Sequence, residues 1–159
     1  MMLEGAEAKG QALEIMLVED SLIDARVTIE SLKSCGYYHR LSLFRLAHEA
    51  IDFLNRRGVF SKAPKPHIIL LDLMLPDSDG VSFLRMLRSN RELMNIPVVI
   101  LTSSEDSEDR LQCEKLGISS YIVKPFNEEK FLNVIRRLKS LALALEAAQC
   151  SDESANPID

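Results

Sequence analysis

Short apolar runs alternate along the chain with longer segments whose apolar residues recur every three or four positions. The runs lie at residues 13–18, 41–46, 67–71, 98–101 and 121–123. Four of them are almost continuously apolar, as expected of parallel strands that are covered on both faces. The run at 41–46 alternates apolar and polar residues, which indicates a more exposed edge strand.

The segments between the runs carry the signals of helices. Ser21 stands where a helix N-cap is expected, and Asp24 follows in the capping-box position. Later helices are expected from residue 47 to Gly58, after the turn at 76–80, over an acid-rich segment that ends at Gly117, and from Asn127 into the apolar stretch 141–145.

Strand and helix therefore alternate five times. This alternation predicts a parallel sheet with helices on both faces, joined by right-handed crossovers. We expect an α/β fold, a flavodoxin-like three-layer (βα)5 sandwich whose five-stranded parallel sheet has the strand order 2-1-3-4-5. It should span residues 13–147, between a disordered N-terminal arm (1–12) and a disordered polar tail (148–159).

Composition and charge narrow the class of protein. The 159 residues are 47% hydrophobic and 27% charged, as in ordinary globular domains. A net charge of -5 provides no basic footprint for nucleic acid. No segment approaches the roughly 18 apolar residues of a membrane span, and the start lacks the apolar core of a signal peptide. We expect a cytoplasmic protein that binds neither nucleic acid nor membrane, with its three cysteines reduced.

Polar side chains stand at the ends of four of the apolar runs. They are Asp20, Asp72, Thr102 and Lys124. Because parallel strands end at one edge of the sheet, and open α/β sheets bind ligands there, these side chains are expected to meet. Each has an ordinary alternative explanation, as a turn residue, a helix cap or a surface lysine. Their occurrence at successive strand ends favours a shared site.

The residue types at this edge suit metal-assisted phosphoryl transfer. Asp72 is the candidate nucleophile, since a carboxylate can accept a phosphoryl group. Asp20 and Asp72 would bind Mg²⁺ directly, and Glu19 would act through water. The backbone carbonyl of Met74 could complete the protein's share of the ligands.

Lys124 and Thr102 would act on the phosphoryl group itself. The lysine offers a point charge to the phosphoryl oxygens, and the threonine offers a hydroxyl. Catalysis would then consist of positioning and charge neutralisation, which a loose phosphoryl-transfer transition state requires.

Four stretches of the sequence closely resemble the receiver domain of bacterial two-component response regulators. They are residues 16–21, 71–80, 100–103 and 121–126, and the resemblance covers about residues 13–145.

The resemblance implies a role for each matching residue. Asp72 is the phosphoacceptor, and Glu19 and Asp20 are the acidic metal pair. Thr102 is the switch hydroxyl and Tyr121 the switch aromatic, while Lys124 binds the phosphoryl group.

The resemblance also implies a function. The chain is expected to be a stand-alone regulator, not an enzyme, that takes phosphate from a sensor histidine kinase, of the phytochrome type, or from a phosphotransfer protein, and that signals through protein contacts. A pseudo-receiver scaffold without phosphorylation is the alternative. An aspartyl-nucleophile phosphatase is disfavoured because Met74 stands where that chemistry needs a second Asp.

The last predicted helix carries more leucines than one core stripe requires. Leu132, Leu141 and Leu143 are left over and could form a second apolar face. This pattern predicts a homodimer through the C-terminal helix and the face of the fourth and fifth predicted helices.

Overall fold

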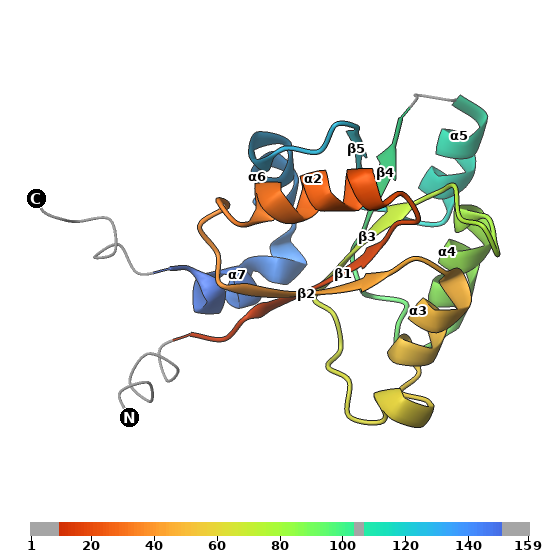
Figure 1. Cartoon of the computed structure of the whole chain (residues 1–159), viewed down its shortest axis with the longest axis horizontal. Coiled ribbons are helices and arrows are strands. Elements are labelled where there is room, and N and C mark those ends of the chain that lie inside the picture. Colours follow the sequence, from red (N-terminus) through yellow and green to blue (C-terminus); the bar gives the residue numbers. More distant parts are fainter. Residues whose placement is uncertain (1–9, 104–106, 151–159) are drawn as a thin grey trace, which may run out of the picture.

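The computed structural model describes residues 10–103 and 107–150. Within these residues, one parallel sheet has the order β2-β1-β3-β4-β5 (Figure 1). Its strands are β1 (Leu13–Val18), β2 (His39–Phe44), β3 (Ile68–Asp72), β4 (Val98–Thr102) and β5 (Ser120–Val123). The predicted fold class and strand order are confirmed.

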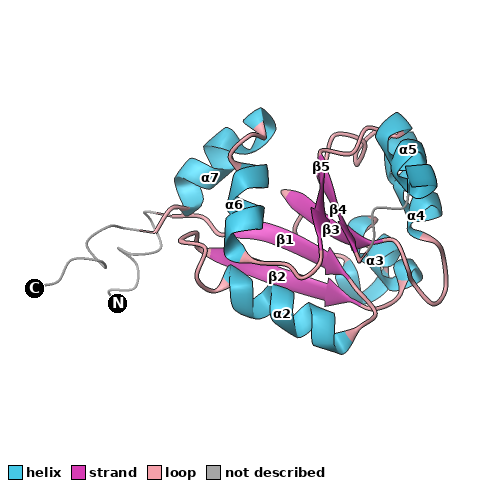
Figure 2. Ribbon diagram, turned by 90° about the horizontal axis from the view of Figure 1, so that it is seen from above, coloured by secondary structure: helices cyan, strands magenta, loops and turns pink. Residues whose placement is uncertain are grey.

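Helices cover both faces of the sheet. On one side lie α2 (Leu22–Leu32), α6 (Glu128–Ile135) and α7 (Ala142–Ala148), and on the other lie α3 (Ala47–Leu54), α4 (Gly80–Ser89) and α5 (Ser107–Lys115). Figure 2 shows α6 and α7 well apart from α3, α4 and α5, with β3, β4 and β5 between them. Short 3-10 helices, η1 (Gly58–Phe60) and η2 (Lys139–Leu141), complete the described part.

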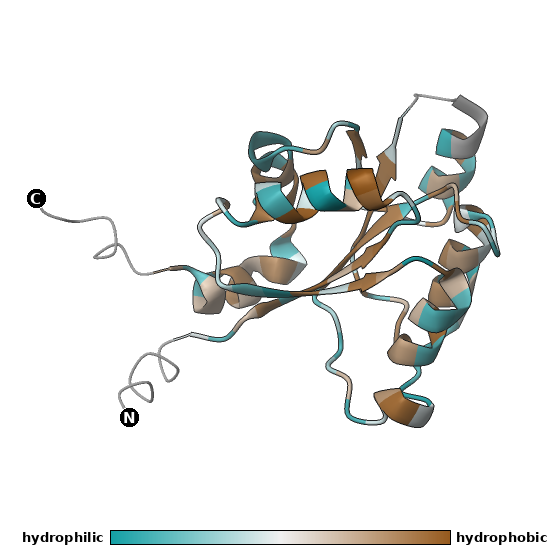
Figure 3. Cartoon of the chain, viewed as in Figure 1, coloured by the Kyte–Doolittle hydropathy of each residue, from teal (hydrophilic) through white to brown (hydrophobic). Residues whose placement is uncertain are grey.

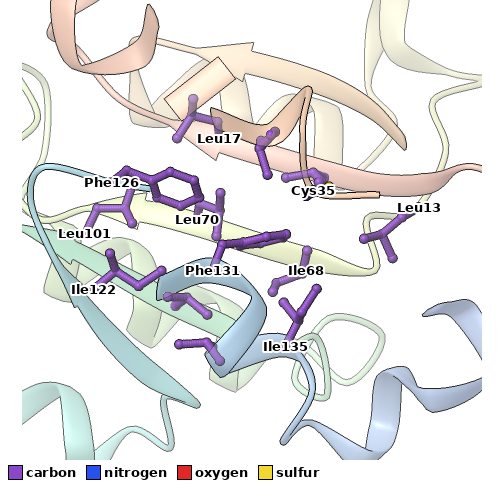
Figure 4. Packing of buried hydrophobic residues seen from close by; sticks show 14 of the residues in the cluster. Leu13, Leu17, Cys35, Ile68, Leu70, Leu101, Ile122, Phe126, Phe131 and Ile135 are labelled. Atoms are coloured by element: carbon purple, nitrogen blue, oxygen red, sulfur yellow. The ribbon is translucent and has the colours of Figure 1, made fainter. Parts of the chain in front are cut away.

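The strands divide the core into two apolar clusters. In β1, Ile15 and Leu17 face the α2 side, whereas Met16 and Val18 face the α3 side. Figure 3 shows that the central strands are the most hydrophobic part of the chain. In the first cluster Phe131 of α6 packs among residues of β1, β3 and β5 (Figure 4). Burial on both faces explains why these strands do not alternate in sequence.

Local signals place most element ends correctly. The Ser21 side chain accepts a hydrogen bond from the Asp24 amide at 3.2 Å, which confirms the predicted cap of α2. Strand β2 begins two residues before the predicted start, because His39 already pairs with Leu13 of β1. Its half-buried side chains agree with its place at the sheet edge.

The prediction of one long C-terminal helix is wrong. The chain leaves α6 after Ile135 and forms η2 before α7 begins. This break turns Leu141, 2% exposed, into the first core cluster, and Leu132 also packs against that cluster. Of the three leftover leucines only Leu143 is exposed, at 81%, so the predicted second apolar face does not form.

The described ends of the predicted arm and tail belong to the fold. The Gln11 amide donates to the Ala147 carbonyl, and the Tyr38 amide donates to that of Ala148. The Cys150 amide donates to the Gly36 carbonyl. The domain boundaries at 12 and 148 were thus drawn too tightly. The prediction of disorder for 1–9 and 151–159 lies outside the described residues. In the described part, no helix is long and apolar enough to cross a membrane.

Candidate functional site

Strand register brings the predicted residues together at the carboxyl edge of the sheet. Val18 pairs with Leu71, which places Glu19 beside Asp72. Thr102 pairs with Val123, the residue before Lys124. The chain turns away after each strand, so the polar residues end at one rim.

These residues line one cavity of about 420 Å³. Its walls include every residue that the sequence assigned to the site, namely Glu19, Asp20, Asp72, Met74, Thr102, Tyr121 and Lys124. The structure therefore brings all of them together at a single concave site of the kind that binds small ligands.

Lys124 is the centre of a buried ion cluster. Its Nζ lies 2.8 Å from Asp72 Oδ2, 2.9 Å from Asp24 Oδ2 and 2.9 Å from Glu19 Oε1. Burial alone would lower the pKa of the ammonium, but hydrogen bonds to the carboxylates outweigh it and raise that pKa. Lys124 is therefore a permanent positive charge beside the candidate nucleophile.

Asp72 is held as a carboxylate although it is only 6% exposed. Burial opposes ionisation, but the interactions of Asp72 with the neighbouring Glu19, with Lys124 and with the Met74 amide lower its pKa below the usual range. The Met74 amide donates to Oδ1 at 2.8 Å, and Lys124 donates to Oδ2. Each carboxylate oxygen is thus oriented by its own donor.

Glu19 is the carboxylate of the site whose negative charge is least well stabilised. Its side chain is fully buried, and burial, followed by its proximity to Asp72, raises its pKa to about 7. Oε2 accepts the Ser21 amide at 3.1 Å. Oε1 lies near the Lys124 ammonium without hydrogen-bond geometry, so this buried oxygen has no hydrogen-bond partner among the described residues. One ammonium does not neutralise the surrounding carboxylates.

Asp20 is less enclosed than Glu19. Its side chain is 45% exposed and lies 3.5 Å from the Arg45 guanidinium, which also donates to the Asp20 carbonyl. Among residues 10–103 and 107–150, no three acidic, His or Cys side chains are arranged as a formed metal site.

The donor set nevertheless fits a divalent cation. The buried Glu19 oxygen without a hydrogen-bond partner and the three carboxylates around one ammonium show negative charge that is not balanced. Carboxylate and carbonyl oxygens are the ligands that Mg²⁺ prefers.

Tyr121 connects the cavity to α5. Its hydroxyl donates to the Arg110 carbonyl at 2.7 Å, and the Arg110 guanidinium lies 4.6 Å from the ring centroid. Burial raises the pKa of this phenol, so it remains a neutral donor. Thr102 lines the same cavity from the end of β4 and is half-buried.

One residue of the site is missing from the sequence-based prediction. The sequence predicts no site role for Asp24, yet its carboxylate binds Lys124. No local pattern reveals this contact, because the partner is 100 residues away in the chain. The available signal is a third acid shortly after Glu19 and Asp20.

Comparison with known proteins decides the family. The model of the response regulator receiver domain matches residues 15–136. The chain belongs to this family. Response regulator Rcp1 of Synechocystis sp. is 36% identical over 129 residues, which cover 81% of this chain and 88% of Rcp1.

Two solved structures extend the similarity to phytochrome response regulators. Bacteriophytochrome response regulator RtBRR matches with a TM-score of 0.73 and 36% identity, over 81% of this chain and 79% of its own. The phosphorylated cyanobacterial phytochrome response regulator RcpA matches with a TM-score of 0.72 and 31% identity, over 89% of this chain and 100% of its own.

Receivers of this family signal through phosphorylation of an aspartate and bind a divalent metal. One matching structure is the Mn²⁺-bound form of Rcp1, with a TM-score of 0.69 and 34% identity, over 87% of this chain and 98% of its own.

Proposed function

We propose that this protein is a stand-alone receiver that accepts a phosphoryl group on Asp72 in a Mg²⁺-dependent step. The observation that carries the proposal is the state of Asp72, an oriented carboxylate between Lys124 and the unbalanced Glu19. Four charged groups that line the cavity each have a use in phosphoryl transfer, namely Glu19, Asp20, Asp72 and Lys124.

The chemistry follows from the contacts. An Asp72 oxygen attacks phosphorus while the bond from phosphorus to the donor's leaving group breaks, which leaves an aspartyl phosphate. Glu19, Asp20, Asp72 and the Met74 carbonyl would hold Mg²⁺, which neutralises phosphoryl oxygens when bound. Lys124 stays beside Asp72 and neutralises the charge that the transferred group brings.

The phosphoryl donor is a sensor histidine kinase, in this proposal one of the phytochrome type, or a phosphotransfer protein. The support is the similarity to Rcp1 and to the phytochrome response regulators RtBRR and RcpA. In this proposal the receiver itself signals by protein contacts and does not turn over a small substrate.

Thr102 and Tyr121 form the proposed output. A phosphoryl group on Asp72 would draw the Thr102 hydroxyl towards it. Tyr121 would then exchange its hydrogen bond with the Arg110 carbonyl for a more inward position. Because that bond ties the ring to α5, its loss would change the surface of α5. A change in the Tyr121 ring signals in NMR on addition of beryllofluoride is the expected result.

A homodimer through the C-terminal helices and the α5–α6 face stays a prediction. It rests on fewer exposed leucines than the sequence pattern predicts. Leu143 and Leu111 are the exposed leucines there, at 81% and 58%. We expect beryllofluoride to raise the solution mass of the wild type, and Leu111→Ser to prevent this. A monomer mass in all samples contradicts the dimer.

Acetyl phosphate tests the central proposal. With Mg²⁺, the wild type should gain one phosphoryl group by intact mass, and Asp72→Asn should not. Asp52→Asn is the matched control, since Asp52 is an acid on α3 that pairs with Arg57 outside the cavity. A wild type that gains no group, or an Asp72→Asn that gains as much as the wild type, overturns the proposal.

A further inference from the structure

The junction between β2 and α3 contacts two loops of the site, the loop after β1 and the loop after β3. The Phe44 carbonyl accepts the Glu19 amide at 2.9 Å, and Arg45 Nε donates to the Asp20 carbonyl at 3.1 Å. These bonds fix the backbone of the two acids that follow β1. The same junction then begins α3.

Helix α3 takes its cap from another part of the chain. Its N-cap residue is Leu46, whose side chain has no oxygen and makes no capping bond. Asp77, in the loop after β3, replaces it. Asp77 Oδ1 accepts the Ala47 amide at 2.8 Å, and Oδ2 accepts the His48 amide at 3.0 Å. Two of the orphan donors of α3 are thus satisfied from the loop that follows Asp72.

The contact between Asp77 and the start of α3 is electrostatic as well as hydrogen-bonded. His48 Nδ1 lies 2.8 Å from Asp77 Oδ2, and hydrogen bonding to Asp77 raises the pKa of His48. Burial opposes ionisation of Asp77, but the Ala47 and His48 amides outweigh it and lower its pKa to about 2. A carboxylate at a helix N-terminus is also favoured by the helix dipole.

Asp77 lies at the tip of the loop that carries Met74. Met74 and Asp79 form an isolated antiparallel bridge, and the Gly80 amide donates to the Leu73 carbonyl at 2.9 Å. The loop is therefore closed at its base, and Asp77 ties its tip to α3. At its start the Met74 amide orients Asp72.

We propose that Asp77 is a positioning residue for the phosphoryl site: by capping α3 it fixes the loop that presents the Met74 amide to Asp72 and the Met74 carbonyl to the metal. This inference rests on the proposed function. Loss of a group that hydrogen-bonds a metal ligand directly typically weakens metal binding 10–100-fold, and Asp77, which acts through the loop backbone, should lie at the lower end of this range.

A graded set of variants tests the proposal by Mn²⁺ titration. Asp77→Ala should raise the Kd for Mn²⁺ about tenfold. His48→Ala, which keeps both backbone bonds, should raise it less. Asn90→Ala is the control. The Asn90 side chain accepts the Glu92 amide and donates to Asn55 at the other end of α3, so this variant removes side-chain hydrogen bonds of α3 and of a turn away from the cavity and should leave the Kd unchanged.

A second variant separates positioning from helix stability. Leu46→Ser gives α3 its own N-cap, so the double variant Leu46→Ser/Asp77→Ala should recover thermal stability. If Asp77 positions the loop, the Kd for Mn²⁺ stays raised in the double variant. If recovery of stability also restores the Kd, Asp77 acts only on the helix and the proposal is wrong.

The metal-free protein provides an independent readout. The Met74 amide should exchange its hydrogen faster in Asp77→Ala and in the double variant, and at the wild-type rate in Asn90→Ala. Unchanged exchange in Asp77→Ala overturns the proposal. A wild type that binds no Mn²⁺ and gains no phosphoryl group refutes the proposed function instead, so the two failures are distinguishable.

Discussion

Charged residues have different partners at the two edges of the sheet: other charges at the carboxyl edge, and neutral backbone carbonyls at the amino edge. At the carboxyl edge, Lys124 faces the carboxylates of Glu19, Asp24 and Asp72, and one buried oxygen has no hydrogen-bond partner. At the amino edge, Arg88 donates to four backbone carbonyls, those of Met94, Ile96, Leu116 and Gly117.

This difference indicates that the amino edge contributes to stability, whereas the carboxyl edge is built for function. At the amino edge, a charged side chain satisfies neutral backbone groups, which join the end of α4 to the segments before β4 and β5. At the carboxyl edge, charges of one sign are concentrated beyond what one lysine neutralises. A surplus of negative charge destabilises the isolated protein, but it binds the cation that neutralises an incoming phosphoryl group.

Lys124→Gln should have the largest effect on the reaction. Without the ammonium beside Asp72, the rate of phosphorylation by acetyl phosphate should fall about 100-fold or more, as on loss of other preorganised electrostatic donors. The rate is measured by intact mass with saturating Mg²⁺. A loss below tenfold would show that the metal alone neutralises the incoming group.

Arg88→Gln should have the largest effect on folding. Half-buried carbonyls lose their donor, and the free energy of unfolding should fall by about 2–3 kcal/mol in urea titrations. Phosphorylation of the folded fraction should be unchanged. The contrast between the edges fails if Arg88→Gln slows phosphorylation as much as Lys124→Gln does.

The stability of the metal-free protein should decrease between pH 5 and 7. Glu19 has its pKa raised to about 7 in the folded state, so its protonated form stabilises the fold below its ordinary value of 4.5, and this stabilisation is lost as the pH rises through about 7. Asp72 also has a shifted pKa, but it is lowered, so Asp72 changes the stability only below about its ordinary pKa of 3.8, outside the range from pH 5 to 7.

Urea titrations in EDTA should show a decrease of about 2–3 kcal/mol in the wild type, relative to Glu19→Gln, over this pH range. His48 is present in both proteins, so its contribution cancels. Saturating Mg²⁺ should abolish the decrease, since the cation replaces the proton. Parallel pH profiles for wild type and variant in EDTA would show that Glu19 is not the titrating group.

Asp24→Asn should have the smallest effect. Its carboxylate is 42% exposed and competes with Asp72 for Lys124, so its loss should raise the phosphorylation rate only a few-fold and change the free energy of unfolding by less than about 1 kcal/mol. Glu30→Gln, whose carboxylate pairs with Lys33 on the exposed side of α2, is the matched control. A slower rate in Asp24→Asn would show that Asp24 assists Lys124.

The sequence predicted the fold and the list of site residues because both depend on local patterns. Continuous apolar runs identify strands buried on both faces, and polar residues directly after them must lie at one edge of a parallel sheet. This reasoning predicts that Asp20, Asp72, Thr102 and Lys124 share a site, although the sequence contains no interatomic distances. It could not separate Glu19, fully buried, from its half-exposed neighbour Asp20.

Only the tertiary structure decided which residues are partners. The contacts of Asp24 with Lys124 and of Asp77 with α3 join segments 100 and about 30 residues apart, and neither leaves a periodic signal in the sequence. The break between α6 and α7 is of the same kind. Leu141 continues a helical pattern, but burying it against the first core cluster is more favourable than extending the helix. Local patterns determine which elements form, whereas packing and charge between distant segments determine their ends and their contacts.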